Sequence, residues 1–126
     1  MNFDNLTSPR KSIHRDNLRR EDFLVYGVTD RHWLQEGERL PDVVRKALDG
    51  GATFIQLREK QLDEADFMAE ALEIQKLCRE YDVPFVINDN VEIALKMDAD
   101  GVHVGQSDME AGNVREKLGP GKIIGV

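Results

Sequence analysis

The stretch TFIQLREK at residues 53–60, followed by DEADFMAEALEIQKLCREY at 63–81 and PFVI at 84–87, decides the fold. A short apolar run leads into a long amphipathic segment and then into a second short apolar run. Apolar residues in the long segment recur at steps of three and four, which is the period of a helix. Apolar strands joined by a helix are typical of a unit with two parallel strands.

The same unit recurs along residues 23–126. We expect further strands at 24–28, 101–104 and from 122 onward, and further helices at about 43–48, 90–97 and 109–118. This alternation predicts an α/β protein, either a barrel or an open doubly wound sheet, and the pattern does not choose between them. A complete (β/α)8 barrel needs ~250 residues. Residues 23–126 would supply about the first five strands and four helices of such a barrel, broken off within its fold.

Composition limits the possible partners. The 126 residues carry 17 Lys and Arg against 24 Asp and Glu, a formal net charge of −7, which argues against nucleic acid or an anionic membrane as a partner. No apolar run approaches the ~20 residues that span a bilayer. One cysteine, Cys78, excludes an internal disulfide and favours a reducing, cytoplasmic setting. Residues 1–22 are expected to form a solvated leader, with a short helix at about 15–20.

Polar side chains follow each expected strand. Because parallel strands point the same way, the residues that leave their carboxyl ends gather on one rim, where ligands bind in both barrels and open sheets. We therefore take these residues as one candidate site. They are Thr29, Asp30 and Arg31; Gln56, Arg58 and Lys60; Asn88, Asp89 and Asn90; and His103, Gln106 and Asp108.

The group after the second strand is the most informative. In an extended segment alternate residues share a face, so Gln56, Arg58 and Lys60 are expected to project together, away from Leu57. Burying an amide and two cations is unfavourable unless an anion meets them. The pattern therefore predicts a phosphate-binding face. The alternative is an ion-pair network of these cations with Glu59 and Asp89.

Two aspartates on the same rim suggest a divalent metal. Mg²⁺ commonly takes one or two carboxylates and leaves its other positions to water and phosphate oxygens, so Asp89 and Asp108 could hold it beside a phosphorylated ligand. Each aspartate also starts a sequence that resembles a capping box, and capping is the commoner role for a lone aspartate. Ser107 is better placed to cap the helix that follows Asp108.

Weaker candidates lie near the fourth strand. An inward-facing His103 could act as a general acid or base, although a hydrogen-bonded core histidine is commoner. Gly105 beside Gln106 would let the backbone approach a ligand closely.

Four segments together resemble the successive strand-end motifs of the thiamine-phosphate synthase family: YGVTD at 26–30, QLREK at 56–60, INDN at 87–90 and GVHVGQSD at 101–108. Each motif alone is weak, but the ordered set, which covers residues 24–126, is specific. The resemblance implies a (β/α)8 barrel. It also implies the transfer of a pyrimidine unit from hydroxymethylpyrimidine diphosphate to thiazole phosphate, which gives thiamine phosphate and pyrophosphate.

Roles carried over from the family fall on the residues already singled out. Gln56, Arg58, Lys60 and Asn88 would hold the pyrimidine diphosphate, with Arg58 and Lys60 aiding departure of pyrophosphate, and Asp89 and Asp108 would bind Mg²⁺. The family pattern continues with a serine-containing strand end, a lysine-bearing loop and a glycine-rich phosphate loop that residues 1–126 do not contain. We therefore expect little activity from this chain alone.

Two other interpretations remain open. The chain could be a non-catalytic half-barrel that pairs with a second copy or a partner through its open sheet edges, with vestigial ligand binding. It could also resemble the related thiazole tautomerases, which share the barrel; the aspartate pair favours the synthase.

Overall fold

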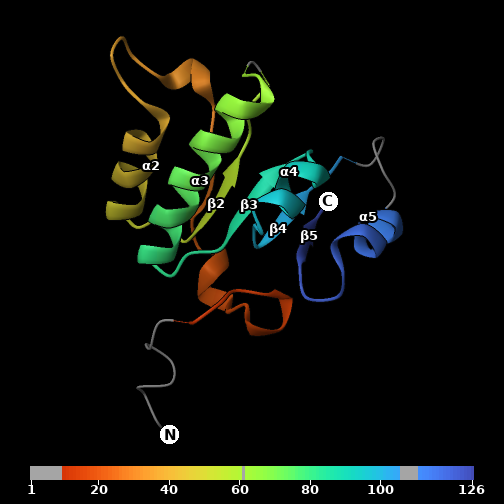
Figure 1. Ribbon diagram of the computed structural model, residues 1–126. Coiled ribbons are helices and arrows are strands. Elements are labelled where there is room, and N and C mark those ends of the chain that lie inside the picture. Colours follow the sequence, from red (N-terminus) through yellow and green to blue (C-terminus); the bar gives the residue numbers. More distant parts are fainter. Residues whose placement is uncertain (1–9, 61, 106–110) are drawn as a thin grey trace, which may run out of the picture.

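The structure is a computed structural model, and it describes residues 10–60, 62–105 and 111–126. Its centre is a parallel five-stranded sheet in the order β1-β2-β3-β4-β5 (Figure 1). The strands are β1 (Tyr26–Val28), β2 (Phe54–Leu57), β3 (Phe85–Asn88), β4 (Gly101–His103) and β5 (Ile123–Gly125). Each strand pairs with the next strand along the chain. A doubly wound sheet would reverse this order at a switch point, so the sequential order favours the barrel arrangement.

Four α-helices alternate with the strands. They are α2 (Leu40–Asp49), α3 (Glu64–Glu80), α4 (Val91–Lys96) and α5 (Ala111–Leu118), and three 3₁₀ segments lie at Arg15–Asn17, Arg20–Phe23 and Arg31–Trp33. Asp63 caps α3 as its sequence suggests, since its side chain accepts the Asp66 N–H at 2.8 Å. No helix within the described ranges is long and apolar enough to span a membrane.

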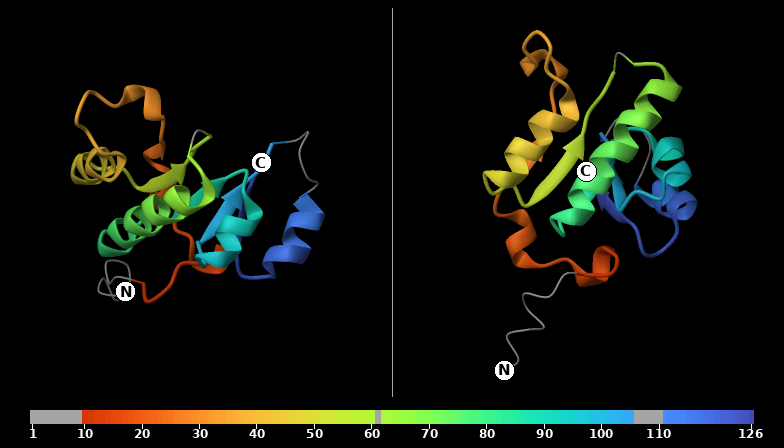
Figure 2. Two further views of the ribbon diagram at one scale, coloured as in Figure 1. Left: turned by 45° about the horizontal axis from the view of Figure 1, so that its top comes forward. Right: turned by 60° about the vertical axis from the view of Figure 1, so that its left-hand side comes forward.

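The two faces of the sheet are covered differently (Figure 2). On one face, alternate strand residues such as Leu57, Ile87 and Val102 are fully buried against the helices and form the main core. On the other face a small second cluster joins Phe54, Val86 and Ile123 to Ile13 and Leu18 from the N-terminal segment. The helices therefore supply one side of the core, and residues 10–23 cover the lower part of the other.

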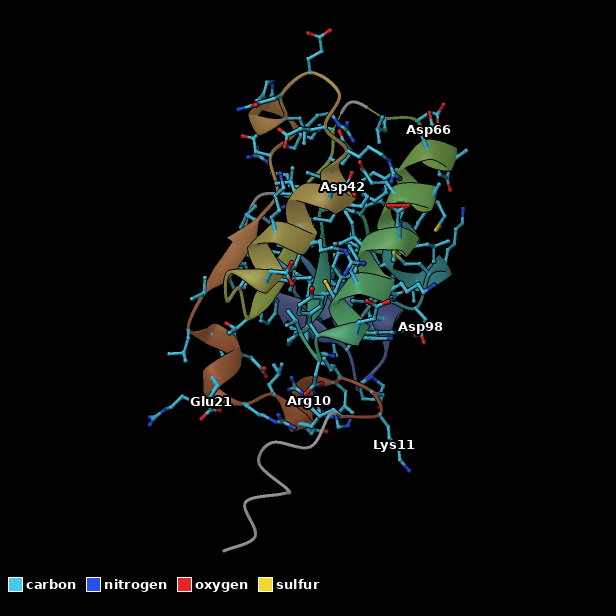
Figure 3. All side chains as sticks on the ribbon, turned by 90° about the vertical axis from the view of Figure 1, so that its left-hand side faces the viewer. Arg10, Lys11, Glu21, Asp42, Asp66 and Asp98 are labelled. Carbon is cyan, nitrogen blue, oxygen red and sulfur yellow. The ribbon has the colours of Figure 1, made fainter. Side chains whose placement is uncertain are left out.

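This N-terminal segment departs from the expected solvated leader. Figure 3 shows Arg10 at the base of the molecule, at the end opposite to Asp66. Its guanidinium donates to both carboxylate oxygens of Asp22, at 2.8 and 2.9 Å, and to Asp82 Oδ1 at 3.0 Å. Further along, the Arg15 N–H donates to the Gly121 carbonyl. The segment forms two short 3₁₀ turns that are fixed to the base of the sheet, and not a single helix at 15–20.

Candidate functional site

A ladder of three polar side chains crosses the helix-free face, from Tyr26 at the start of β1 through Gln56 on β2 to Asn88 at the end of β3. Asn88 Nδ2 donates to Gln56 Oε1 at 2.8 Å, and Gln56 Nε2 donates to the Tyr26 hydroxyl at 2.9 Å. Gln56 is only 3% exposed. These two hydrogen bonds therefore give both polar ends of its amide a partner where water has little access. Gln56 and Asn88 therefore meet, as expected for two parts of one site.

Tyr26 was missed by the sequence reasoning. Its burial raises the pKa of the phenol, against a smaller lowering effect of the hydrogen bond from Gln56. Its ring also stacks on Phe54, with the ring centroids 4.5 Å apart. The signal was available in the strand alternation, because Tyr26 lies two residues before Val28, the partner of Gln56 in the sheet.

Above this ladder Arg58 and Lys60 line an open cleft of about 210 Å³ between the loops that follow β1 and β2. Both side chains are exposed. Within the described ranges, no hydrogen bond or ion pair engages the charged group of either residue. Asp30, on the opposite loop, has its pKa lowered mainly by hydrogen bonds from His32 and slightly by the charge of Arg58. The two cations are thus brought together, as predicted, on a surface that an anion can reach.

The alternative network of these cations with Glu59 and Asp89 is not what forms. Glu59 borders the same cleft, but its side chain is only 1% exposed and its carboxylate accepts a hydrogen bond from Arg31 at 2.6 Å. Arg31 also contacts Glu70 on α3 at 2.5 Å. The acidic residue between the two cations is therefore paired elsewhere.

Thr29 is buried and contacts the backbone next to the cleft. Its hydroxyl oxygen accepts a hydrogen bond from the Arg58 backbone N–H at 2.9 Å. The same hydroxyl donates a hydrogen bond to the Arg58 carbonyl oxygen at 3.3 Å. Thr29 therefore lies at the cleft, as anticipated, but its side chain is engaged by the protein backbone.

Asp89 is exposed and lies directly after β3. The capping interpretation was wrong for this residue, because Asn90 caps α4 by accepting the Ile93 N–H at 3.0 Å. Asp89 instead adopts a left-handed backbone, with a φ of 58°, and its N–H donates to the His103 carbonyl at 2.7 Å. A positive φ is unusual for a residue with a side chain. In the described part of the chain its carboxylate has no hydrogen-bond or ion-pair partner, which leaves both oxygens for a cation.

The remaining candidates are only partly defined. Gln106 and Asp108 lie outside the described residues, so the predicted pairing of Asp89 with Asp108 cannot be placed. Among the described residues, no group of three or more His, Cys, Asp and Glu side chains is arranged to hold a metal ion. A two-carboxylate site of the kind expected for Mg²⁺ needs fewer protein ligands than that.

His103 is half-buried on β4, next to Asn88 in the sheet register. Its ring lies against Gly125 on β5, where an added Cβ would stand 2.6 Å from Nδ1. No hydrogen bond to the ring occurs in the described ranges, so the expected hydrogen-bonded core histidine is not seen there. The missing side chain at Gly125 leaves room for the imidazole.

Comparisons with known proteins identify the family of the chain. The family model described as thiamine monophosphate synthase matches residues 25–126. A thiamine-phosphate synthase of Geobacillus kaustophilus is 56% identical over 96 residues, which cover 73% of this chain and 43% of that protein. A thiamine biosynthetic bifunctional enzyme of Saccharomyces cerevisiae is 49% identical over 104 residues, which cover 82% of this chain and 19% of that protein.

A solved structure, thiamine phosphate pyrophosphorylase from Pyrococcus furiosus, has the same fold. It superposes with a TM-score of 0.74 at 38% identity, over 83% of this chain and 50% of that chain. The chain thus spans at most about half the length of these three relatives. The expected α/β fold of the barrel type is confirmed.

Proposed function

Because the chain belongs to the thiamine monophosphate synthase family, we propose that it supplies the part of a thiamine-phosphate synthase that binds hydroxymethylpyrimidine diphosphate. The pyrimidine unit is then transferred to thiazole phosphate, with thiamine phosphate and pyrophosphate as products. The observation that carries this proposal is the exposed pair Arg58 and Lys60 on one cleft. Arg presents a planar fork to phosphate oxygens and Lys a mobile charge, so together they suit a diphosphate.

The polar ladder beneath the cleft is the proposed seat of the pyrimidine end. Asn88 uses one of its amide hydrogens toward Gln56 and keeps a second N–H and its carbonyl oxygen for a ligand. The Tyr26–Gln56 bond fixes the amide of Gln56, which in turn fixes that of Asn88. The ladder would therefore supply an oriented donor and acceptor, and Gln56 lies two residues before Arg58 along the same chain segment.

Magnesium is the proposed cofactor, and Asp89 fits it because its exposed carboxylate lacks a partner within the described ranges. The second ligand, Asp108, remains a prediction from the sequence. Diphosphate oxygens and water would complete the shell. When bound, the ion supplies positive charge to the leaving diphosphate.

The residues of the cleft suit a dissociative transfer. The bond between the pyrimidine methylene carbon and the diphosphate oxygen breaks, and its electron pair leaves with pyrophosphate. The lone pair of the thiazole nitrogen then forms the new carbon–nitrogen bond. Arg58 and Lys60 would stabilise the charge that develops on the leaving oxygen. No protein nucleophile is needed.

Calorimetric titration with magnesium pyrophosphate tests this site directly. The chain should bind with a Kd of about 1 mM or tighter, and Arg58→Gln or Lys60→Gln should weaken binding by about tenfold or more. Lys76→Gln, an exposed lysine on α3, is the matched control and should bind as the unchanged chain does. Folded protein that binds no ligand at millimolar concentration would refute the proposal.

Asp89→Asn distinguishes the contribution of the metal ion to pyrophosphate binding from that of Arg58 and Lys60. It should abolish the gain in pyrophosphate affinity that Mg²⁺ produces and leave binding in the presence of a chelator unchanged. If magnesium strengthens binding equally in both proteins, Asp89 is not a ligand.

We also propose that the chain works in the cytoplasm and associates with a second copy. The cytoplasmic setting rests on its lone cysteine, Cys78, which is free and buried.

Association is supported by apolar side chains at the β1 edge, among them Phe23, Leu24 and Val25, which are 54%, 73% and 52% exposed. Light scattering after size-exclusion chromatography should give a dimer, and Leu24→Lys should give a monomer. A monomeric unchanged chain would exclude this pairing.

A further inference from the structure

The contacts of Glu59 explain how two neighbouring cations come to face the same way. Arg58 and Lys60 are exposed at the cleft, whereas the side chain of Glu59 between them is only 1% exposed. These residues continue directly from β2, which ends at Leu57, and they keep the alternation of a strand, in which neighbouring side chains project to opposite sides. Whatever holds Glu59 therefore also sets the direction of both cations.

Arg31 is the group that holds it. Its Nε donates to Glu59 Oε2 at 2.6 Å, and its Nη2 donates to Glu70 Oε1 at 2.5 Å. One guanidinium thus joins the loop after β2 to helix α3, which is packed firmly on the core. The planar fork of arginine can make both bonds at once, and a lysine ammonium at the same position cannot reproduce that geometry.

Two backbone hydrogen bonds complete the arrangement. The Lys60 N–H donates to the second oxygen of Glu59 at 3.0 Å, and the Arg58 N–H donates to the Thr29 hydroxyl. Thr29 and Arg31 belong to the same loop after β1. The backbone on either side of Glu59 is therefore held by that loop, which is itself tied to α3.

Glu70, the second carboxylate bound by Arg31, lies in an unusual environment. Its Oε2 is buried and has no hydrogen-bond partner among the described residues. Burial raises the pKa of Glu70, against the opposing effect of Arg31 and with further raising by Glu59 and Glu73. A carboxyl group kept in such a place needs its partner Arg31, so the network fixes Arg31 as firmly as it fixes Glu59.

We infer that Arg31, acting through Glu59 and Glu70, is a positioning residue that turns Arg58 and Lys60 toward the cleft. Arg31 and Glu59 also border the cleft, but their charged groups are bound to each other and to Glu70. The consequence for anion binding rests on the proposed function, but the ordering of the loop does not.

Amide hydrogen exchange, followed by NMR on the full chain without ligand, tests the ordering. Arg31→Lys keeps the charge and removes the fork, and it should speed exchange at the Arg58 and Lys60 amides by about tenfold. The control is Arg39→Lys, because Arg39 makes an exposed ion pair with Glu73 between α2 and α3 and should leave both rates unchanged. Unchanged rates in Arg31→Lys would overturn the inference, whether or not the chain binds pyrophosphate.

Glu59→Gln gives a second test that does not depend on the folding of the Arg31 variant. Removing a negative charge beside two cations should tighten pyrophosphate binding if only charge mattered. Positioning predicts the opposite, a weakening of about fivefold or more in titration with magnesium pyrophosphate. Tighter binding would therefore contradict the inference. If the unchanged chain binds no pyrophosphate, the proposed function fails, and amide exchange alone decides the role of Arg31.

Discussion

The two ends of the sheet use the same residue type in opposite ways. At the base, Arg10 has a side chain that is 7% exposed and makes ion pairs with Asp22 and Asp82. At the carboxyl-terminal rim, Arg58 is exposed and, within the described ranges, has no ion-pair partner. A buried arginine that is fully paired holds chain segments together, whereas an exposed one beside a cleft is available to a ligand.

This difference indicates that the residues that stabilise the fold lie at the base of the sheet and that the residues available for binding lie at its rim. The base contains apolar packing under the sheet and buried charge pairs, while the rim contains exposed cations and the left-handed Asp89. Changes at the base should therefore alter the free energy of unfolding and spare ligand binding. Changes at the rim should do the reverse. The following experiments test this division.

The largest effect is expected from Gly101→Ala at the base. A Cβ there would lie 2.0 Å from the Ile123 carbonyl oxygen, and backbone cannot move aside without parting β4 from β5. We expect a loss of about 4 kcal/mol in the free energy of unfolding, measured by urea denaturation. Gly121→Ala is the control, because an added Cβ meets nothing within 4 Å. If Gly101→Ala is as stable as Gly121→Ala, the close approach of β4 and β5 at Gly101 does not limit stability.

Arg10→Ala should come next, because it removes the paired guanidinium from the buried Asp22 and the partly buried Asp82. Both carboxylates then keep contacts with Arg19. A loss of about 3 kcal/mol is expected, again from urea denaturation. Lys11→Ala, an exposed neighbour, should change stability little. If Arg10→Ala proves as mild as Lys11→Ala, the N-terminal segment does not stabilise the base.

Asp100, also at the base, should make stability depend on pH. Burial raises its pKa to about 6, with smaller lowering effects from the Phe85 N–H, Arg79 and Lys122 and a raising effect from Asp98. The folded chain therefore keeps this proton up to about pH 6, whereas the unfolded chain loses it near ~3.9. The contribution of Asp100 to the free energy of unfolding is therefore fully present at low pH and is lost as the pH rises through 6.

Asp100→Asn should consequently be more stable than the unchanged chain at pH 8, by about 1 kcal/mol. Thermal melts at pH 8 and pH 4 check this, and the difference should vanish at pH 4. A difference that is the same at both pH values would show that ionisation of Asp100 is not its cause.

The smallest effect on stability is expected at the rim. Arg58→Gln should change the free energy of unfolding by less than about 0.5 kcal/mol, although it should weaken pyrophosphate binding by about tenfold or more. Denaturation and titration of the same preparation give both numbers. A large loss of stability in Arg58→Gln would break the division between the two ends.

Much of this division was predictable from local sequence. The β2–α3–β3 unit was predicted to within one residue at each end, because its strands are apolar on both faces and Asp63 gives α3 a clear start. The rim cations were predicted because alternation in a strand is a local rule. The sequence left Asp89 open as either a metal ligand or the cap of α4. Asn90 is the cap, because Asp89 has a left-handed backbone.

The base could not be predicted in this way. Arg10 and Asp82 lie 72 residues apart, and no periodic pattern connects them. Tyr26 and Gln56 are separated by 30 residues and meet only because β1 and β2 pair in one particular register. The Arg31 network needed the same long-range information, since Glu70 belongs to the exposed half of an ordinary amphipathic helix until its partner is known.

The fixed N-terminal segment has a consequence for biosynthesis. A ribosome makes residues 10–23 before any strand, yet Asp82 and the Gly121 carbonyl, to which Arg10 and Arg15 bind, are made much later. Contacts so far apart in sequence form late, because a long loop must close first. Ile13 and Leu18 therefore stay without their packing partner Ile123 until that residue has been made. A nascent chain stalled before Gly121 would keep this segment sensitive to protease, although every residue of the segment had already been made.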